Sequence, residues 1–198
     1  MKQSSKLSAY KDLIKTYHRT LDLMSGRAVA SLDEKVQEAQ GYPDFIAPRL
    51  SPSDRILDIG SGAGLPGIPL ALAFPEQRVT LVERRQRRAN FLRIVVGQLG
   101  LTNVEVVGTD VQVFQAAPYR WVCAQAVGSF SLLYCLTRHL HGDTVSILSR
   151  RSDLSPTEQG ALERFTGPIL DAESVPLPTH GKLVALRLQG GRPCPLSV

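Results

Sequence analysis

Apolar residues near the start of the chain recur in steps of three and four, from Leu7 and Tyr10 to Leu21 and Met24. This spacing places them on one face of an α-helix over residues 7–24. A weaker helical pattern follows over residues 31–40, and Gly41-Tyr42-Pro43 then interrupts it. The pattern predicts an N-terminal helical extension over residues 1–50.

From residue 55 onward, short β-rich segments alternate with helical ones, which is typical of βαβ units and a mostly parallel sheet. Strands are expected at residues 55–59, 78–82, 104–107, 121–124, 144–148 and 183–188, and helices at 67–73, 84–99, 130–139 and 156–165. Residues 51–190 therefore form one Rossmann-like α/β domain. The tail, residues 191–198, is rich in glycine and proline and is expected to be flexible.

Composition narrows the class of protein. A chain of 198 residues with 43% hydrophobic residues is long enough to bury a core. Its apolar runs fall short of the roughly 20 residues that span a bilayer, and its start lacks the apolar segment of a signal peptide, so we expect a cytoplasmic protein without a membrane partner. The three cysteines lack metal-ligand spacing, so no metal is expected.

The loop after the first expected strand carries the clearest chemistry; it reads Asp58-Ile59-Gly60-Ser61-Gly62-Ala63-Gly64. Glycines let a backbone adopt positive φ and approach a ligand closely, and the following helix start offers N–H groups to an anion. Residues 62–67 also match the G-x-G-x-x-G pattern of dinucleotide-binding proteins. Asp58 inside the strand end, and Pro66 without a backbone N–H, favour S-adenosylmethionine (SAM) over NAD.

Two further carboxylates follow the next two expected strands. Glu83 is placed to accept hydrogen bonds from both ribose hydroxyls of a nucleoside; the alternative is a surface pair with Arg87. Asp110 is placed to accept from an adenine amino group while the Val111 N–H donates to a ring nitrogen; the alternative is that Asp110 caps the turn that follows it.

Positive charge is concentrated in one expected helix, which carries Arg84, Arg85, Arg87, Arg88 and Arg93. The net charge of +5 agrees with a polyanionic partner. The arginines form either a solvated helix surface or a set of phosphate contacts. Because the end of the fifth strand lies on the same side of such a sheet, the predicted RNA-facing residues are Arg84, Arg87, Arg88, Arg150 and Arg151.

The stretch Leu57-Asp58-Ile59-Gly60-Ser61-Gly62-Ala63-Gly64-Leu65-Pro66-Gly67-Ile68-Pro69-Leu70-Ala71, with residues 91–93 and 99–105, closely resembles the RsmG (GidB) family. The resemblance implies a class I SAM-dependent methyltransferase fold and methylation of a guanine N7 in 16S ribosomal RNA, with rRNA or the 30S subunit as partner. We expect the chain to be a monomer. Together with the loop, it predicts a SAM site formed by Asp58, Gly60, Ser61, Gly62, Gly64, Leu65, Glu83, Asp110, Val111 and Gln125.

The chain departs from the family pattern on the substrate side. Gln125 stands where members usually carry an arginine, and Ser149 stands where a lysine is common. Gln125 is thus the residue predicted nearest the reacting groups. The Asn-Leu-Thr and His-x-x-Asp-Ser motifs of the family's N-terminal extension are absent between Thr20 and Tyr42. Two interpretations stay open: a diverged rRNA methyltransferase, or a paralogue that binds SAM but has another substrate or serves as a non-catalytic binding module.

Overall fold

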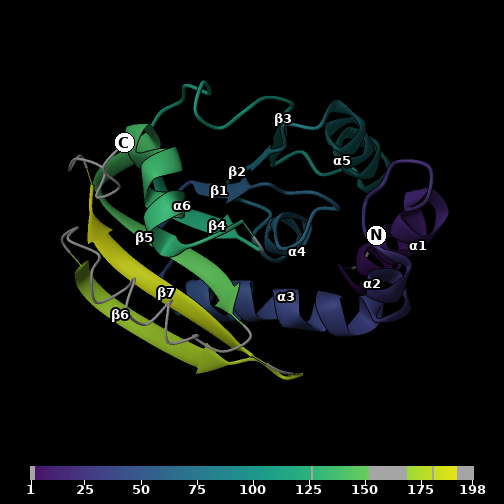
Figure 1. Ribbon diagram of the computed structural model, residues 1–198, viewed down its shortest axis with the longest axis horizontal. Helices are drawn as coiled ribbons and strands as arrows, with labels where there is room; N and C mark the ends of the chain where they lie inside the picture. Colours follow the sequence, from purple (N-terminus) through teal and green to yellow (C-terminus); the bar gives the residue numbers. More distant parts are fainter. Residues whose placement is uncertain (1–2, 126, 152–168, 180, 191–198) are drawn as a thin grey trace.

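The computed structural model describes residues 3–125, 127–151, 169–179 and 181–190, and its centre is a mixed sheet in the order β3-β2-β1-β4-β5-β7-β6 (Figure 1). The strands are β1 Ile56–Ile59, β2 Val79–Val82, β3 Val104–Val107, β4 Tyr119–Ala124, β5 His141–Arg151, β6 Ile169–Pro176 and β7 Lys182–Gln189. The helices are α1 Gln3–Tyr17, α2 Gly26–Ala30, α3 Leu32–Ile46, α4 Gly67–Ala73, α5 Gln86–Leu99 and α6 Phe130–Thr137, with short 3₁₀ turns at Ala47–Arg49 and Arg138–Leu140.

The strand pairing fixes where a ligand can bind. β1 pairs in parallel with β2 on one side and β4 on the other, and β3 and β5 extend the parallel sheet outward. β7 then runs antiparallel between β5 and β6. The strand order reverses between β1 and β4, and in sheets of this kind ligands bind beyond the carboxyl ends of the strands at that reversal.

Alternating side chains divide the core into two layers. On one face of the sheet, Ile56, Leu81 and Cys123 pack with residues of α1, α3, α4 and α5. On the other face, Leu57 and Ile59 pack with residues of α6. All four residues of β1 are buried, as expected for a central parallel strand covered on both sides.

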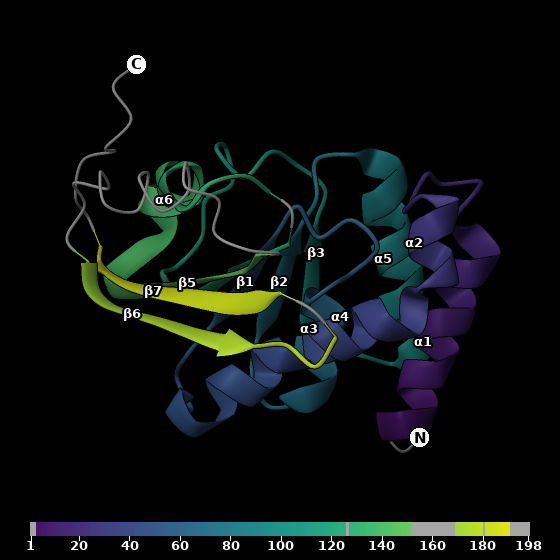
Figure 2. The same ribbon diagram turned by 60° about the horizontal axis from the view of Figure 1, so that its bottom comes forward.

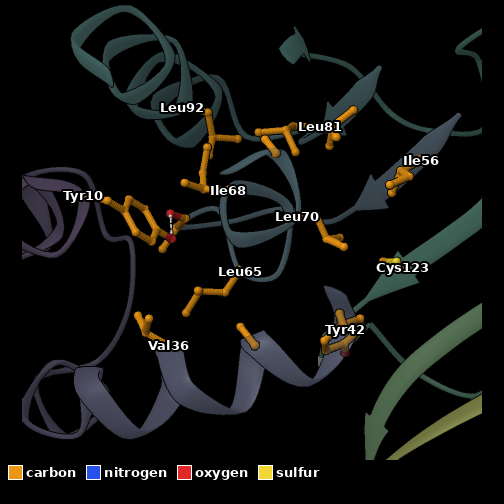
Figure 3. Packing of buried hydrophobic residues seen from close by; sticks show 14 of the residues in the cluster. Tyr10, Val36, Tyr42, Ile56, Leu65, Ile68, Leu70, Leu81, Leu92 and Cys123 are labelled. Carbon is orange, nitrogen blue, oxygen red and sulfur yellow. Dashed lines mark hydrogen bonds between the residues drawn. The ribbon is translucent and has the colours of Figure 1, made fainter. Parts of the chain in front are cut away.

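The N-terminal helices belong to the same core as the sheet. Tyr10, Val36 and Tyr42 share one buried cluster with Ile56 and Leu70, and the helices that carry them close around α4 (Figure 3). Figure 2 shows α3 passing beneath the sheet beside α4, with α1 standing next to α5. The extension is therefore packed as part of the domain. No helix in the described part of the chain has both the length and the apolar character needed to cross a bilayer.

The structure corrects the boundaries of two predicted helices. The first helix ends at Tyr17, short of the expected Met24. α3 runs through Gly41, Tyr42 and Pro43, where the sequence predicted a break. The fully buried Tyr42 explains the continuation, because its hydroxyl donates to the Ala124 carbonyl at 2.8 Å and so anchors this turn to the sheet. Such a tertiary contact outweighs the weak helix propensity of glycine and proline.

Strand β6 was not predicted, because an alternating apolar pattern arises only where one face is buried. Most of its residues are exposed at the sheet edge, and it is held by backbone pairing with β7. Pairing with β7 also explains why β5 continues past the expected end at residue 148, since the two strands pair as far as Arg151. The helix expected at residues 156–165 and the tail at 191–198 lie outside the described residues.

A buried ion pair joins α3 to the end of β5. The Arg150 Nε lies 2.7 Å from Glu38 Oε2, and a second guanidinium nitrogen donates to Oε1 at 3.1 Å. Thr179, in the connection between β6 and β7, donates to the same Oε1 at 2.8 Å. Glu38 is only 1% exposed, so its charge is neutralised where water cannot reach it.

Candidate cofactor and substrate site

The loop between β1 and α4 lies at the carboxyl edge of the sheet and depends on its glycines. Gly60, Gly62 and Gly64 have φ values of 64°, 54° and 100°, in the left-handed region that other L residues rarely adopt. A Cβ added to Gly60 would lie 2.9 Å from Val127 Cγ2, and one added to Gly64 would lie 2.7 Å from Ile68 Cγ1. At Gly62 the nearest atom would be the Gly60 carbonyl oxygen, 3.7 Å away. Gly62 is therefore the open position of the loop.

Glu83, at the end of β2, fastens this loop to the next turn. Its Oε2 accepts a hydrogen bond from the Gly62 N–H at 2.9 Å, and its Oε1 accepts one from the Arg85 N–H at 2.8 Å. Ser61 is tied back to β1 by a bond from its hydroxyl to the Asp58 carbonyl at 3.0 Å. A carboxylate offers about four acceptor positions, so two remain on Glu83. That number matches the two hydroxyls of a ribose.

Asp58 lies beneath the loop. It is 0% exposed, and its Oδ2 accepts from the Gly67 N–H at 3.2 Å, while its Oδ1 has no hydrogen-bond partner among the described residues. Burial, with a smaller contribution from the Glu83 charge, raises the pKa of this carboxyl to about 7, although the hydrogen bond from Gly67 acts to lower it. Asp58 thus fixes the first turn of α4 from below and does not face the open side of the loop.

The start of α4 does not offer the free N–H groups expected from the sequence. The Gly67 N–H is bound to Asp58, and the Ile68 N–H donates to the Gly64 carbonyl at 2.8 Å. Pro66 and Pro69 have no N–H to give. Leu65 is 9% exposed and its side chain points into the core near Val36 (Figure 3). Leu65 is therefore a core-packing residue.

The predicted adenine-binding pair lies in the turn after β3. The Asp110 Oδ1 accepts from the Gln112 N–H at 3.0 Å, and the Asp110 carbonyl accepts from the Val113 N–H at 3.2 Å. Asp110 therefore caps this turn, which was the alternative to an adenine contact in the sequence analysis. Val111 is 9% exposed and packs into the core layer of α6. An adenine contact at these two residues stays a prediction.

Gln125 and Ser149, which mark the departures from the family pattern, lie at the same edge of the sheet. Ala124 pairs in register with Ser149, and Gln125 follows directly. The Gln125 Oε1 and the Ser149 Oγ are both buried without a hydrogen-bond partner among the described residues. Val127 packs against Gly60, so the segment after β4 borders the glycine loop.

The five predicted RNA-facing arginines differ in whether other residues of the chain bind them. Arg84 and Arg87 are exposed and form no ion pair within the described part of the chain. Arg88 instead binds the loop after α1: its Nε donates to the Asp22 carbonyl at 2.8 Å, and its guanidinium pairs with the Asp22 carboxylate at 3.3 Å.

The remaining two, Arg150 and Arg151, lie at the end of β5. Arg150 is held by Glu38, as described above. Arg151 donates to the Gly128 carbonyl at 2.7 Å and stacks on the Phe130 ring at 4.7 Å. The sequence alone did not reveal these partners, because each lies far away along the chain.

Comparison with solved structures shows which fold the chain has. The chain matches a structure described as cofactor-bound Rv0187 from MTB with a TM-score of 0.64 and 19% identity, over 93% of this chain and 89% of that one. It matches M. jannaschii TYW2 in complex with AdoMet with a TM-score of 0.61 and 15% identity, over 78% of this chain and 77% of that one. The fold is that of class I SAM-dependent methyltransferases.

The family follows from sequence relatives. The model of the GidB family, described as rRNA small subunit methyltransferase G, matches residues 3–166. Ribosomal RNA small subunit methyltransferase G of Pseudomonas aeruginosa is 34% identical over 154 residues, which are 77% of this chain and 70% of that protein. Its counterpart in Methylobacillus flagellatus is 38% identical over 112 residues, 56% of this chain and 55% of that protein. The chain belongs to the GidB family.

The buried Asp58 makes a testable contribution to stability. An unfolded aspartate ionises near pH 3.8, whereas folded Asp58 keeps its proton to about pH 7. The folded state therefore binds more protons between these values, and the free energy of unfolding falls as the pH rises through them, by on the order of 4 kcal/mol. Asp58→Asn should remove this fall, as measured by urea unfolding between pH 4 and pH 8.

The exposed Asp44 supplies the control, and Asp44→Asn should give a curve parallel to that of the unmodified protein. If the Asp58→Asn curve is also parallel, the carboxyl is ionised in the folded state and the pKa assignment is wrong.

Proposed function

We propose that this chain transfers the methyl group of SAM to the N7 atom of a guanine in 16S ribosomal RNA. The observation that carries the proposal is the glycine loop fastened to Glu83 at the carboxyl edge of β1 and β2, in a chain of the GidB family. The relatives are named for methylation of ribosomal RNA of the small subunit. No corresponding observation favours a non-catalytic binding module.

The residues at this edge fit SAM, which supplies a methyl group on a positively charged sulfur. The open side of Gly62 admits a ligand close to the backbone. Glu83 keeps two acceptor positions for the ribose hydroxyls while its backbone bonds hold it in place. Asp110 and Val111 are the proposed contacts of the adenine ring, and Gln125 is the residue proposed to lie between cofactor and substrate.

The reaction needs positioning more than proton transfer. The N7 atom of guanine carries an available lone pair, so no general base has to remove a proton before methyl transfer. The residues of this chain then have to align the base with the methyl group and exclude water. The Gln125 side chain is the proposed neutral hydrogen-bond partner of the target base. We expect the chain to act as a monomer on rRNA or the 30S subunit in the cytoplasm.

The exposed arginines at the start of α5 form the proposed RNA contact. Arg84 follows Glu83 directly, and Arg87 lies in the first turn of the helix, so both stand beside the cofactor residues. Arg88 and Arg150 contribute less, because Asp22 and Glu38 already neutralise them.

Methyl transfer tests the function directly. Incubation with radiolabelled SAM and 30S subunits or free 16S rRNA from a strain without this activity should label 16S rRNA at a base that becomes sensitive to cleavage at N7-methylguanine. Glu83→Ala should weaken binding of S-adenosylhomocysteine by about 1.5–3 kcal/mol, because a charge-assisted bond to the ribose is lost. Glu76→Ala, an exposed carboxylate before β2, should leave the affinity unchanged.

Absence of labelling, together with normal binding of S-adenosylhomocysteine, would overturn the rRNA substrate and leave the paralogue interpretation. Unchanged affinity of Glu83→Ala would remove the ribose assignment.

Salt dependence tests the RNA contact. If Arg84 and Arg87 neutralise phosphates, the logarithm of RNA affinity should fall linearly with the logarithm of salt concentration, and replacing both by Ala should reduce the slope by about 1–2. Arg78→Ala, an exposed arginine before the amino end of β2, should leave the slope unaltered. Equal slopes for all three proteins would show that the two arginines form only a solvated helix surface.

Restoring the family's arginine tests the role of Gln125. An arginine offers a charged, forked donor where glutamine offers a neutral amide. Gln125→Arg should raise the single-turnover rate of methyl transfer to 30S subunits, by tenfold for about every 1.4 kcal/mol gained in the transition state. A rate that stays the same or falls would show that position 125 does not limit the reaction in this chain.

A further inference from the structure

Two buried tyrosines reach from the N-terminal helices to the carboxyl edge of the sheet. Tyr10 of α1 and Tyr42 of α3 are each 0% exposed. Each hydroxyl donates a hydrogen bond to a backbone carbonyl at this edge, at 2.8 Å in both cases. In the sequence, Tyr10 fell on the apolar face of the first expected helix, and Tyr42 fell in the expected break after residue 40.

Tyr10 binds inside the glycine loop. Its hydroxyl donates to the carbonyl of Ala63, which lies between Gly62 and Gly64 (Figure 3). In a planar trans peptide the carbonyl and the next N–H point in opposite directions, so this bond also orients the Gly64 N–H, which donates to the Ser61 carbonyl at 2.6 Å. Burial raises the pKa of Tyr10 well above its usual value, and the nearby Asp58 charge adds to this, so the hydroxyl remains a donor.

Tyr42 binds where β4 and β5 end. Its hydroxyl donates to the Ala124 carbonyl and accepts from the Arg150 N–H at 2.9 Å. Ala124 precedes Gln125, and Arg150 follows Ser149. One hydroxyl therefore holds β4 and β5 together directly before Gln125 and directly after Ser149.

We infer that Tyr10 and Tyr42 are positioning residues of the active site: Tyr10 holds the glycine loop in the form that binds the cofactor, and Tyr42 holds the end of β4 that presents Gln125. The inference rests on the proposed function for the methyl-transfer step. On this inference, the N-terminal helices α1 and α3 position the residues of the site. Because neither hydroxyl is exposed, each acts through the backbone and touches no ligand.

The test compares three Tyr→Phe variants, each of which loses one buried hydroxyl and keeps its ring. Tyr119→Phe is the matched control: Tyr119 is 1% exposed, and its hydroxyl donates to Thr80 Oγ1 at 2.9 Å near the start of β4, away from the site. All three variants should lower the melting temperature. Only Tyr10→Phe should weaken binding of S-adenosylhomocysteine, by about three- to tenfold in calorimetric titration, since a single hydrogen bond is lost.

Tyr42→Phe should retain the affinity for S-adenosylhomocysteine and lower the single-turnover rate of methyl transfer severalfold. A purely structural role predicts that Tyr10→Phe, Tyr42→Phe and Tyr119→Phe differ from the unmodified protein only in melting temperature, and that result would overturn the inference. So would an equal loss of affinity in Tyr10→Phe and Tyr119→Phe.

Amide hydrogen exchange separates this inference from the proposed function. Without any cofactor, the Gly64 amide should exchange faster in Tyr10→Phe than in Tyr119→Phe, because the loop opens more often when the Ala63 carbonyl is released. Faster exchange at Gly64 supports the role of Tyr10 even where rRNA is not methylated. Equal exchange in the two variants contradicts it even where methylation is found.

Discussion

The structure depends on one constraint: the backbone between β1 and α4 must hold three glycines in the left-handed conformation. Gly60, Gly62 and Gly64 provide that conformation, but conformational freedom alone would leave the loop mobile. Three side chains from different elements remove that freedom. Glu83 of β2 binds the Gly62 N–H, Asp58 of β1 binds the Gly67 N–H, and Tyr10 of α1 binds the Ala63 carbonyl. The sheet, the first helix and the loop thus depend on one another.

This arrangement requires two carboxyl groups to be buried, which is unfavourable unless other groups compensate them. Asp58 lies in the core, where one of its oxygens has no hydrogen-bond partner within the described ranges, and burial raises its pKa to about 7. Glu38 is equally buried, but Arg150 neutralises it and Thr179 adds a further hydrogen bond. Both carboxylates lie where the N-terminal helices or α4 meet the sheet, so the polar groups fix how these layers fit together.

Local sequence patterns predicted the elements that are determined by residues close together in the chain. β1 and β2 were recognisable because buried apolar runs form them, and β3 because three of its four residues are valines; the glycine loop and Glu83 followed from their places at the ends of strands. Features that arise only from the tertiary structure were not accessible. The continuation of α3 through Pro43 depends on a bond between Tyr42 and Ala124, and the neutralisation of Arg150 depends on Glu38, 112 positions away. An arginine in a sequence does not reveal whether a carboxylate already binds it.

We expect the carboxyl edge of β1 and β2 to form a cofactor site that is already assembled in the free protein. A crystal structure of the chain with S-adenosylhomocysteine tests it most directly. The ribose hydroxyls are predicted to lie within hydrogen-bond distance of Glu83, with the bonds from Glu83 to Gly62 and from Tyr10 to Ala63 retained. A ligand bound elsewhere, or a glycine loop that breaks these two bonds to admit it, would contradict the account.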